Sequence, residues 1–69
     1  MHYFHLLSSD TPPEPLEGHP PYVTPDEAIR AAAQEAKRRE TRVQVFRGAD
    51  GRFESQPWRV VLPDGTVES

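Results

Sequence analysis

The three histidines are the first residues whose chemistry could matter, because imidazole is the commonest metal ligand in proteins. His2 and His5 lie in a segment predicted to be a strand, and His19 follows in a proline-rich segment. Side chains alternate along a strand, so residues three apart point to opposite faces and cannot chelate one ion. The chain has no cysteine, and no carboxylate has a spacing that completes a ligand set. We predict no bound metal and no cofactor.

Serine and acidic side chains near the histidines raise the question of nucleophilic catalysis. Ser8, Ser9 and Asp10 follow His5 in the sequence but match no catalytic motif. Catalysis requires a nucleophile with a base, or paired carboxylates, on a rigid scaffold around a pocket of ~300 Å³ or more. A chain of 69 residues leaves little volume for one. We predict no catalytic residue and no enzyme activity.

Arginine and aromatic residues form a third group, and they favour binding over catalysis. Both types are enriched at the energetic centres of protein interfaces. They also serve in nucleic-acid recognition, where aromatic rings stack on bases and arginine contacts the backbone. On the exposed face of the predicted sheet we expect a partner-binding surface made of Tyr3, Arg42, Phe46, Arg47, Arg52 and Arg59.

Charge is segregated along the chain, whose net charge is −3. Residues 1–27 contain five acids and no lysine or arginine, whereas residues 28–59 contain all eight bases and four acids. The basic middle could meet a polyanion or an acidic protein surface. Nucleic-acid-binding domains usually have a more strongly basic footprint than this acidic chain. Alternatively, the acidic first third simply offsets the basic middle.

Length and composition indicate one small domain spanning residues 1–69. Without cysteine, neither a disulfide nor a thiolate zinc site can reinforce it, which leaves good packing, self-association or partner binding. No apolar run approaches the ~18 residues that span a bilayer. The N-terminal residues also lack the basic and apolar features of a secretory signal. We expect a soluble, cytoplasmic protein.

One helix, predicted over residues 25–40, must position the rest of the fold. Thr24 is a suitable N-cap, Glu27 can close a capping box, and Pro25 suits the first helical position. Glu35 and Arg39 have the spacing of a helical ion pair. Apolar residues at helical spacing form the stripe expected to face the sheet, namely Ile29, Ala32, Ala33 and Ala36.

Strands are predicted on both sides of the helix. The first covers residues 2–8, with Phe4 and Leu6 on one face and Tyr3, His5 and Leu7 on the other. A proline-rich arm follows at residues 9–24, where five prolines forbid a helix. The later strands are expected at residues 41–47, 52–62 and 66–68, with turns at 48–51 and 63–65 and an interruption at Pro57.

This order predicts an α+β fold in which one helix packs on one face of a small antiparallel sheet. Val43 and Val45 should face the helix, with Arg42, Gln44 and Phe46 on the other face. We expect the first strand to lie beside the third, because every neighbouring pair is then antiparallel. Trp58 is the expected aromatic anchor beneath the alanine stripe.

Two resemblances accompany this pattern. Thr24-x-x-Glu27-Ala28-Ile29-x-x-Ala32, the Val43-x-Val45 strand and the Asp50-Gly51-Arg52 turn resemble a family of small bacterial proteins of unknown function over about residues 24–53. That resemblance implies a fold and no activity. The strand–helix–strand–strand order is also similar to dodecins, which are small flavin-storing oligomers. Thr41-Arg42 stands where that family has its flavin-stacking tryptophan, so we do not expect flavin binding.

The favoured function is therefore a small protein-binding module that docks as an accessory or inhibitory protein on a larger protein or complex. Phage-encoded inhibitors of host defence complexes share this small size, acidity and lack of motifs. One alternative is a nucleic-acid-binding protein that uses the arginine-rich sheet face. Another is a homo-oligomer, for example a homodimer, of unknown role.

Overall fold

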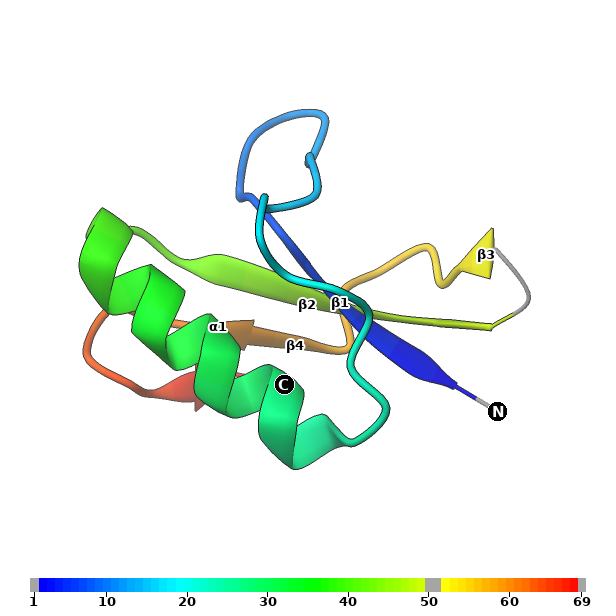
Figure 1. Cartoon of the computed structure of the whole chain (residues 1–69). Helices are drawn as coiled ribbons and strands as arrows, with labels where there is room; N and C mark the ends of the chain where they lie inside the picture. The colour runs from blue at the N-terminus through cyan, green and yellow to red at the C-terminus, as the bar shows by residue number, and fades with distance from the viewer. Residues whose placement is uncertain (1, 50–51, 69) are drawn as a thin grey trace.

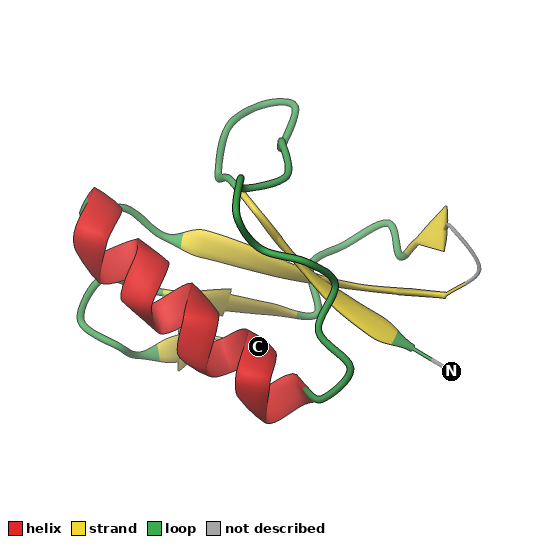
Figure 2. Ribbon diagram, in the orientation of Figure 1, coloured by secondary structure: helices red, strands yellow, loops and turns green. Residues whose placement is uncertain are grey.

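The computed structural model describes residues 2–49 and 52–68. One helix lies across one face of an antiparallel sheet, which confirms the predicted α+β fold (Figures 1 and 2). No helix in these residues is long and apolar enough to cross a bilayer. In chain order the elements are β1 (Tyr3–Leu7), α1 (Pro25–Arg39), β2 (Val43–Ala49), β3 (Arg52–Phe53), β4 (Arg59–Val61) and β5 (Val67–Glu68).

Both ends of α1 are fixed by local contacts. At the start, the Thr24 hydroxyl accepts a hydrogen bond from the Glu27 N–H at 3.4 Å, and Pro25 occupies the first turn as predicted. At the end, Glu40 adopts a left-handed conformation with φ 56°, and its N–H reaches the carbonyls of Ala36 and Lys37. The helix ends there because this backbone conformation cannot continue a right-handed helix.

The buried stripe of α1 is rotated from the predicted one. Ala28, Ala32 and Ala36 are completely buried, whereas Ile29 and Ala33 lie at the edge of the interface and are only partly buried. Three alanines at i, i+4 and i+8 form one line, and their small side chains let the helix backbone approach the sheet closely. The larger Ile29 packs against the edge of the core rather than at its centre.

The predicted place of the first strand is wrong. β1 pairs with β2 rather than with the strand that begins at residue 52, although every pairing described is antiparallel, as expected. The reason is the arm, which runs back along the outer edge of β1 before α1 begins (Figure 1). A chain that passed directly from β1 through one helix to β2 would place the two strands parallel. Because the arm reverses direction first, the two strands are antiparallel instead.

Backbone hydrogen bonds and one buried side chain hold the arm against β1. Phe4 and Tyr22 exchange two bonds of 2.8 and 2.9 Å, and the Leu16 N–H donates to the Leu6 carbonyl at 3.0 Å. The Leu16 side chain is buried in the main core. The arm therefore covers what would otherwise be an open sheet edge.

The second edge of β2 is shared by β3 and β4, which are separated by a detour of the chain. The detour ends where the Trp58 N–H donates to the Val45 carbonyl at 2.8 Å. The predicted interruption at Pro57 is thus confirmed. Asp50 and Gly51, the centre of the predicted hairpin turn before β3, lie outside the described residues. The next predicted turn is present, with Gly65 at φ +92°.

The core lies between α1 and one face of the sheet. Its strand residues are Phe4, Leu6, Val43, Val45 and Val61, which are buried against the alanines of α1. Trp58 is half-buried beside this cluster, and its ring centroid lies 4.8 Å from that of Phe4.

The opposite face of the sheet carries few exposed apolar side chains. Phe46 points to this face as predicted, yet it is only 9% exposed, and Leu7 is equally covered. The large hydrophobic residues that are exposed among those described, Tyr3, Val23 and Val67, lie on three separate segments. Tyr3 and Val23 adjoin the paired residues Phe4 and Tyr22, whereas Val67 lies on β5.

Candidate binding site at the base of the proline-rich arm

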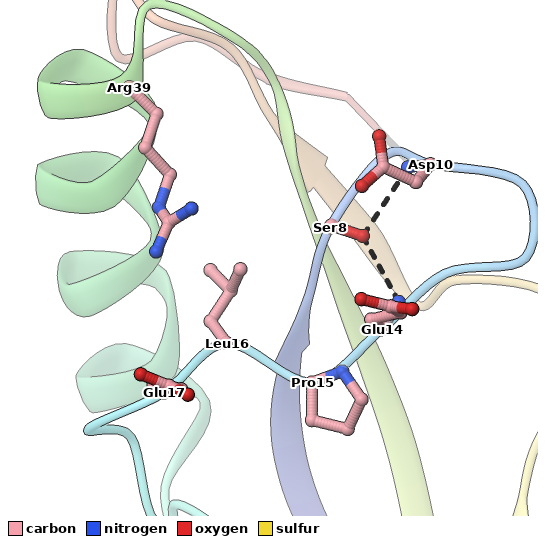
Figure 3. A pocket seen from close by; sticks show the side chains of 7 residues that line it. All are labelled: Ser8, Asp10, Glu14, Pro15, Leu16, Glu17 and Arg39. Atoms are coloured by element: carbon pink, nitrogen blue, oxygen red, sulfur yellow. Dashed lines mark hydrogen bonds between the residues drawn. The ribbon is translucent and has the colours of Figure 1, made fainter.

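A loop of residues 8–17, here called the acidic loop, follows β1, and its tip projects from the sheet before the chain returns to pair with β1 (Figure 1). Its two ends are joined at Ser8. The Ser8 N–H donates to the Glu14 carbonyl at 2.8 Å, and the Ser8 hydroxyl accepts from the N–H groups of Asp10 and Glu14 (Figure 3). A surface loop closed in this way keeps its shape without belonging to a helix or strand.

Two further hydrogen bonds join the acidic loop to β2 and to the residue before it. The Ser9 hydroxyl donates to the Arg42 carbonyl at 2.6 Å, and the Gln44 side-chain amide donates to the Ser8 carbonyl at 2.7 Å. Together with the buried Leu16, these bonds fix both sides of the loop base. The acidic loop is consequently a preorganised surface, which reduces the ordering cost of binding.

Three connected depressions run across the base of this loop, and we call them together the arm groove. The first, of about 340 Å³, lies between the loop and the end of α1 (Figure 3). It shares Ser8, Asp10, Leu16 and Arg39 with a second of about 290 Å³. The second in turn shares Ser9, Thr41 and Arg42 with a third of about 400 Å³.

Opposite charges line the two ends of the arm groove. Asp10, Glu14 and Glu17 line the first depression together with Arg39. Arg42 joins Arg39 in the second depression, where the hydroxyl-bearing residues Ser9 and Thr41 are also found. Such a surface can form charge-assisted hydrogen bonds with groups of either sign.

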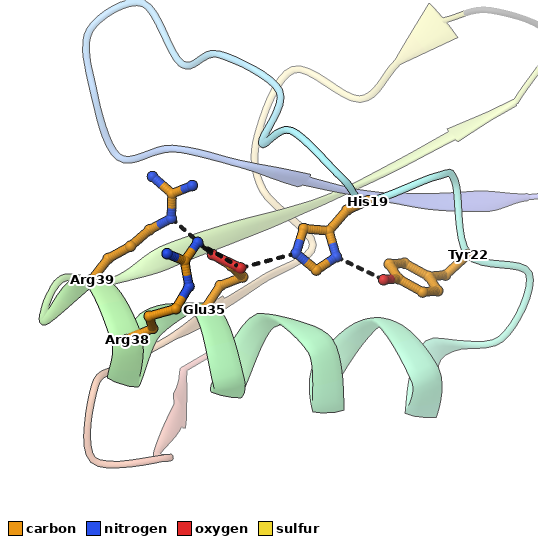
Figure 4. Close-up of polar contacts among 5 residues, drawn as sticks. All are labelled: His19, Tyr22, Glu35, Arg38 and Arg39. Carbon is orange, nitrogen blue, oxygen red and sulfur yellow. Dashed lines mark hydrogen bonds and ion pairs between the residues drawn. The ribbon is translucent and has the colours of Figure 1, made fainter.

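Glu35 holds Arg39 in position. The Arg39 Nε donates to Glu35 Oε2 at 2.8 Å, and the Arg38 Nη2 donates to the same carboxylate at 2.7 and 2.9 Å (Figure 4). The Glu35 side chain is only 11% exposed. Hydrogen bonds from Arg38, Arg39 and His19 lower the pKa of Glu35 to about 2, against a smaller opposing effect of burial.

His19 connects this carboxylate to the arm. Its Nε2 lies 3.2 Å from Glu35 Oε1, and its Nδ1 lies 2.7 Å from the Tyr22 hydroxyl (Figure 4). We call the resulting set the Glu35 cluster; it comprises His19, Tyr22, Glu35, Arg38 and Arg39. The Glu35–Arg39 spacing in the sequence predicted an ordinary surface ion pair. It did not indicate that the carboxylate is buried or that the arm contacts it.

The Glu35 cluster predicts a specific loss of stability in acid. Because the pKa of Glu35 is about 2 in the folded protein and 4.5 for the ordinary group, folding favours the ionised form. The stabilisation is fully present above pH 4.5 and disappears as the pH falls toward 2. Glu35→Gln should lower the free energy of unfolding by about 1–2 kcal/mol at pH 7, since the arginine head groups remain partly solvated. Urea unfolding at several pH values would measure this.

Glu54→Gln is the matched control for this pH prediction. Glu54 accepts hydrogen bonds from Arg47 that lower its pKa, but both side chains are solvated, at 45% and 37% exposure. This substitution should cost less stability at neutral pH than Glu35→Gln does. The difference between wild type and Glu35→Gln should shrink below pH 4.5. A constant difference down to pH 2.5 would contradict the assigned role of the Glu35 carboxylate.

The six predicted partner-binding residues do not share one surface. Directly paired residues of neighbouring strands point to the same face. Arg47 pairs with Phe4 and Arg59 with Val45, so both lie on the helix-facing side of the sheet. Arg52, opposite Ala49, shares that side. The prediction that all six form one exposed face is therefore wrong. Alternation along β2 places Arg47 on the same face as Val43 and Val45, and the prediction left this consequence out.

The remaining predicted residues are divided between two places. Tyr3 and Phe46 lie on the face opposite α1, and Arg42 precedes β2 in the arm groove. The second arginine of the groove, Arg39, was not predicted as a partner-binding residue. Its sequence signal was the helical spacing to Glu35, which indicates an ion pair and not a binding surface.

Of the described histidines, His19 contacts one carboxylate, that of Glu35. Among residues 2–49 and 52–68, no three histidine, aspartate or glutamate side chains form a group that could hold a metal ion. His5 lies on the face opposite α1, where partial burial lowers its pKa.

Comparison with known proteins adds no information on family or function. Protein-family models, curated proteins and solved structures were compared with the chain, and none matched. The resemblances to the small bacterial family over residues 24–53 and to dodecins accordingly stay predictions.

Proposed function

We propose that this chain is a small protein-binding module that docks on a larger protein through the arm groove. The single observation that carries the proposal is the acidic loop, which is fixed at its base by Ser8, Ser9 and Leu16 and walls a groove lined with charged side chains. A rigid, projecting polar surface of this kind suits recognition of another folded protein. An accessory or inhibitory role fits, because such roles require binding alone.

The unpaired charge of the acidic loop supports this proposal. Every arginine–carboxylate ion pair in the described part of the chain joins residues within 28–59. The carboxylates of Asp10, Glu14 and Glu17 take part in none of these pairs. The acidic first third thus does not offset the basic middle through direct ion pairs, and its charge is available to a partner.

The two alternative functions have less support. Nucleic-acid binding would need arginine head groups that are free to contact phosphates, but Arg47 is paired with Glu54 at 2.7 Å and Arg59 lies over the Trp58 ring at 4.3 Å. Assembly into a homodimer through an apolar face would need a continuous exposed patch. Among the described residues, the exposed Val67 lies on β5, at the opposite edge of the sheet from Tyr3 and Val23.

Comparative capture from a lysate of the native host tests the proposal. Wild type, the double variant Asp10→Lys/Glu14→Lys and the control Asp26→Lys would be immobilised at equal density and the bound proteins quantified by mass spectrometry. Asp26 is exposed in the first turn of α1, at the opposite end of the helix from Arg39. We expect at least one protein captured by wild type and by Asp26→Lys but depleted by about tenfold or more with the double variant.

Two results would overturn the proposal. One is that no protein is retained by wild type above the level of a blank support. The other is that the double variant and the control retain the same proteins equally, since the groove would then play no part. Measuring the mass of the wild-type chain in solution checks the homodimer alternative in the same samples.

A further inference from the structure

We infer that the arm groove binds an extended peptide segment with a basic side chain in the first depression and an acidic side chain beside Arg42. This inference rests on the proposed function and names the partner's chemistry. It follows from how the charges are divided between the first two depressions: Glu14 and Glu17 line only the first, Arg42 lines only the second, and Asp10 and Arg39 line both.

The first depression suits a lysine or arginine side chain. Its acidic residues Asp10, Glu14 and Glu17 face a single base, Arg39, among the described lining residues. The Nε of Arg39 is already bound to Glu35, so this guanidinium only partly neutralises the three acids. Pro15 and Leu16 line the same depression and offer apolar contact to the hydrocarbon stem of the incoming side chain.

The second depression suits a carboxylate. Arg39 enters it from α1 and Arg42 from the residue before β2, and guanidinium groups bind carboxylates through paired hydrogen bonds. The Ser9 hydroxyl donates to the Arg42 carbonyl and so keeps the Arg42 backbone beside the loop. Leu16 and Val43 contribute apolar lining.

The position of Asp10 favours a ligand of mixed charge over a lone anion. It lines both the first and the second depressions, so a free phosphate or carboxylate between the arginines would also meet its negative charge. A basic group on the same ligand, placed against Asp10, removes that repulsion. A peptide with both signs of charge meets this requirement, whereas a polyanion such as nucleic acid does not.

Nuclear magnetic resonance titration of the full chain with capped peptides tests this inference directly. The probes are acetylated and amidated alanine peptides that contain one lysine and one glutamate separated by one, two or three residues. Matched peptides with two lysines or two glutamates are the comparison. We expect at least one mixed-charge peptide to bind at least about tenfold more tightly than both comparisons. Its chemical-shift changes should fall in residues 8–17 and 39–44.

Variants complete the test. Arg42→Glu should weaken the best mixed peptide by about tenfold. Arg52→Glu, a charge reversal of equal size at an exposed residue outside the groove, should leave binding unchanged. The inference is overturned if no peptide binds, if two-lysine or two-glutamate peptides bind as tightly, or if Arg42→Glu has no effect.

The peptide titration tests the groove chemistry and the lysate capture tests the docking function, so either experiment can fail while the other succeeds. If groove-dependent capture occurs but no mixed peptide binds, the proposed function stands and the inferred peptide chemistry is wrong. If a mixed peptide binds at the groove but no host protein is captured through it, the groove chemistry stands and the proposed docking function is wrong.

Discussion

Leu16→Ala should lower the free energy of unfolding by about 2–5 kcal/mol, the range for truncating a buried leucine. Leu16 is the arm side chain that enters the main core, where it is 8% exposed. A domain of this size has a total stability of about 3–10 kcal/mol, so the loss is a large fraction of the whole. Urea unfolding would measure it. Hydrogen exchange should show the amides of Leu16 and Tyr22 losing more protection than those of α1.

Val23→Ala is the matched control for Leu16→Ala. Val23 belongs to the same arm and is also apolar, but its side chain is 53% exposed. Its truncation should change stability by no more than about 0.5 kcal/mol. Equal losses for the two variants, or protection of the Leu16 and Tyr22 amides that stays at the wild-type level, would show that Leu16 does not hold the arm in place.

Local signals in the sequence were sufficient to predict the elements of the fold. The Thr24–Glu27 start of α1 and the alternation of Phe4 and Leu6 or of Val43 and Val45 depend on nearest neighbours along the chain. For that reason the predicted ranges agree with the structure to within about two residues at most ends. The interruption at Pro57 was likewise visible, because a proline cannot donate to the sheet.

Long-range features could not be predicted in the same way. The pairing of β1 with β2 depends on the path of the arm, and prolines exclude a helix without saying where an extended segment will lie. The buried position of Glu35 depends on His19, which is 16 residues away in the sequence and reaches it through that same path. The arm groove is also assembled by the arm, so none of its lining could be recognised as one surface.

Ala32→Leu should lower the free energy of unfolding by about 1–3 kcal/mol or more, because it adds three carbon atoms at the closest approach of helix and sheet. Ala32 is completely buried between Ala28 and Ala36, which are themselves completely buried. Leucine and alanine have similar helix propensities, so the helix itself contributes little to this loss. Thermal unfolding should show the effect as a fall in Tm of several degrees, at about 4–8 °C per kcal/mol for a small domain.

Gln34→Leu places the same side chain on the exposed face of α1 and should change stability by only about 0.5 kcal/mol. If Ala32→Leu were equally harmless, the helix would be able to move away from the sheet at no cost. The arm would then have to follow that movement, since His19 links it to Glu35 on the same helix. The position of the arm groove therefore depends on the close packing at Ala32. We expect Ala32→Leu to weaken binding at the groove as well as stability.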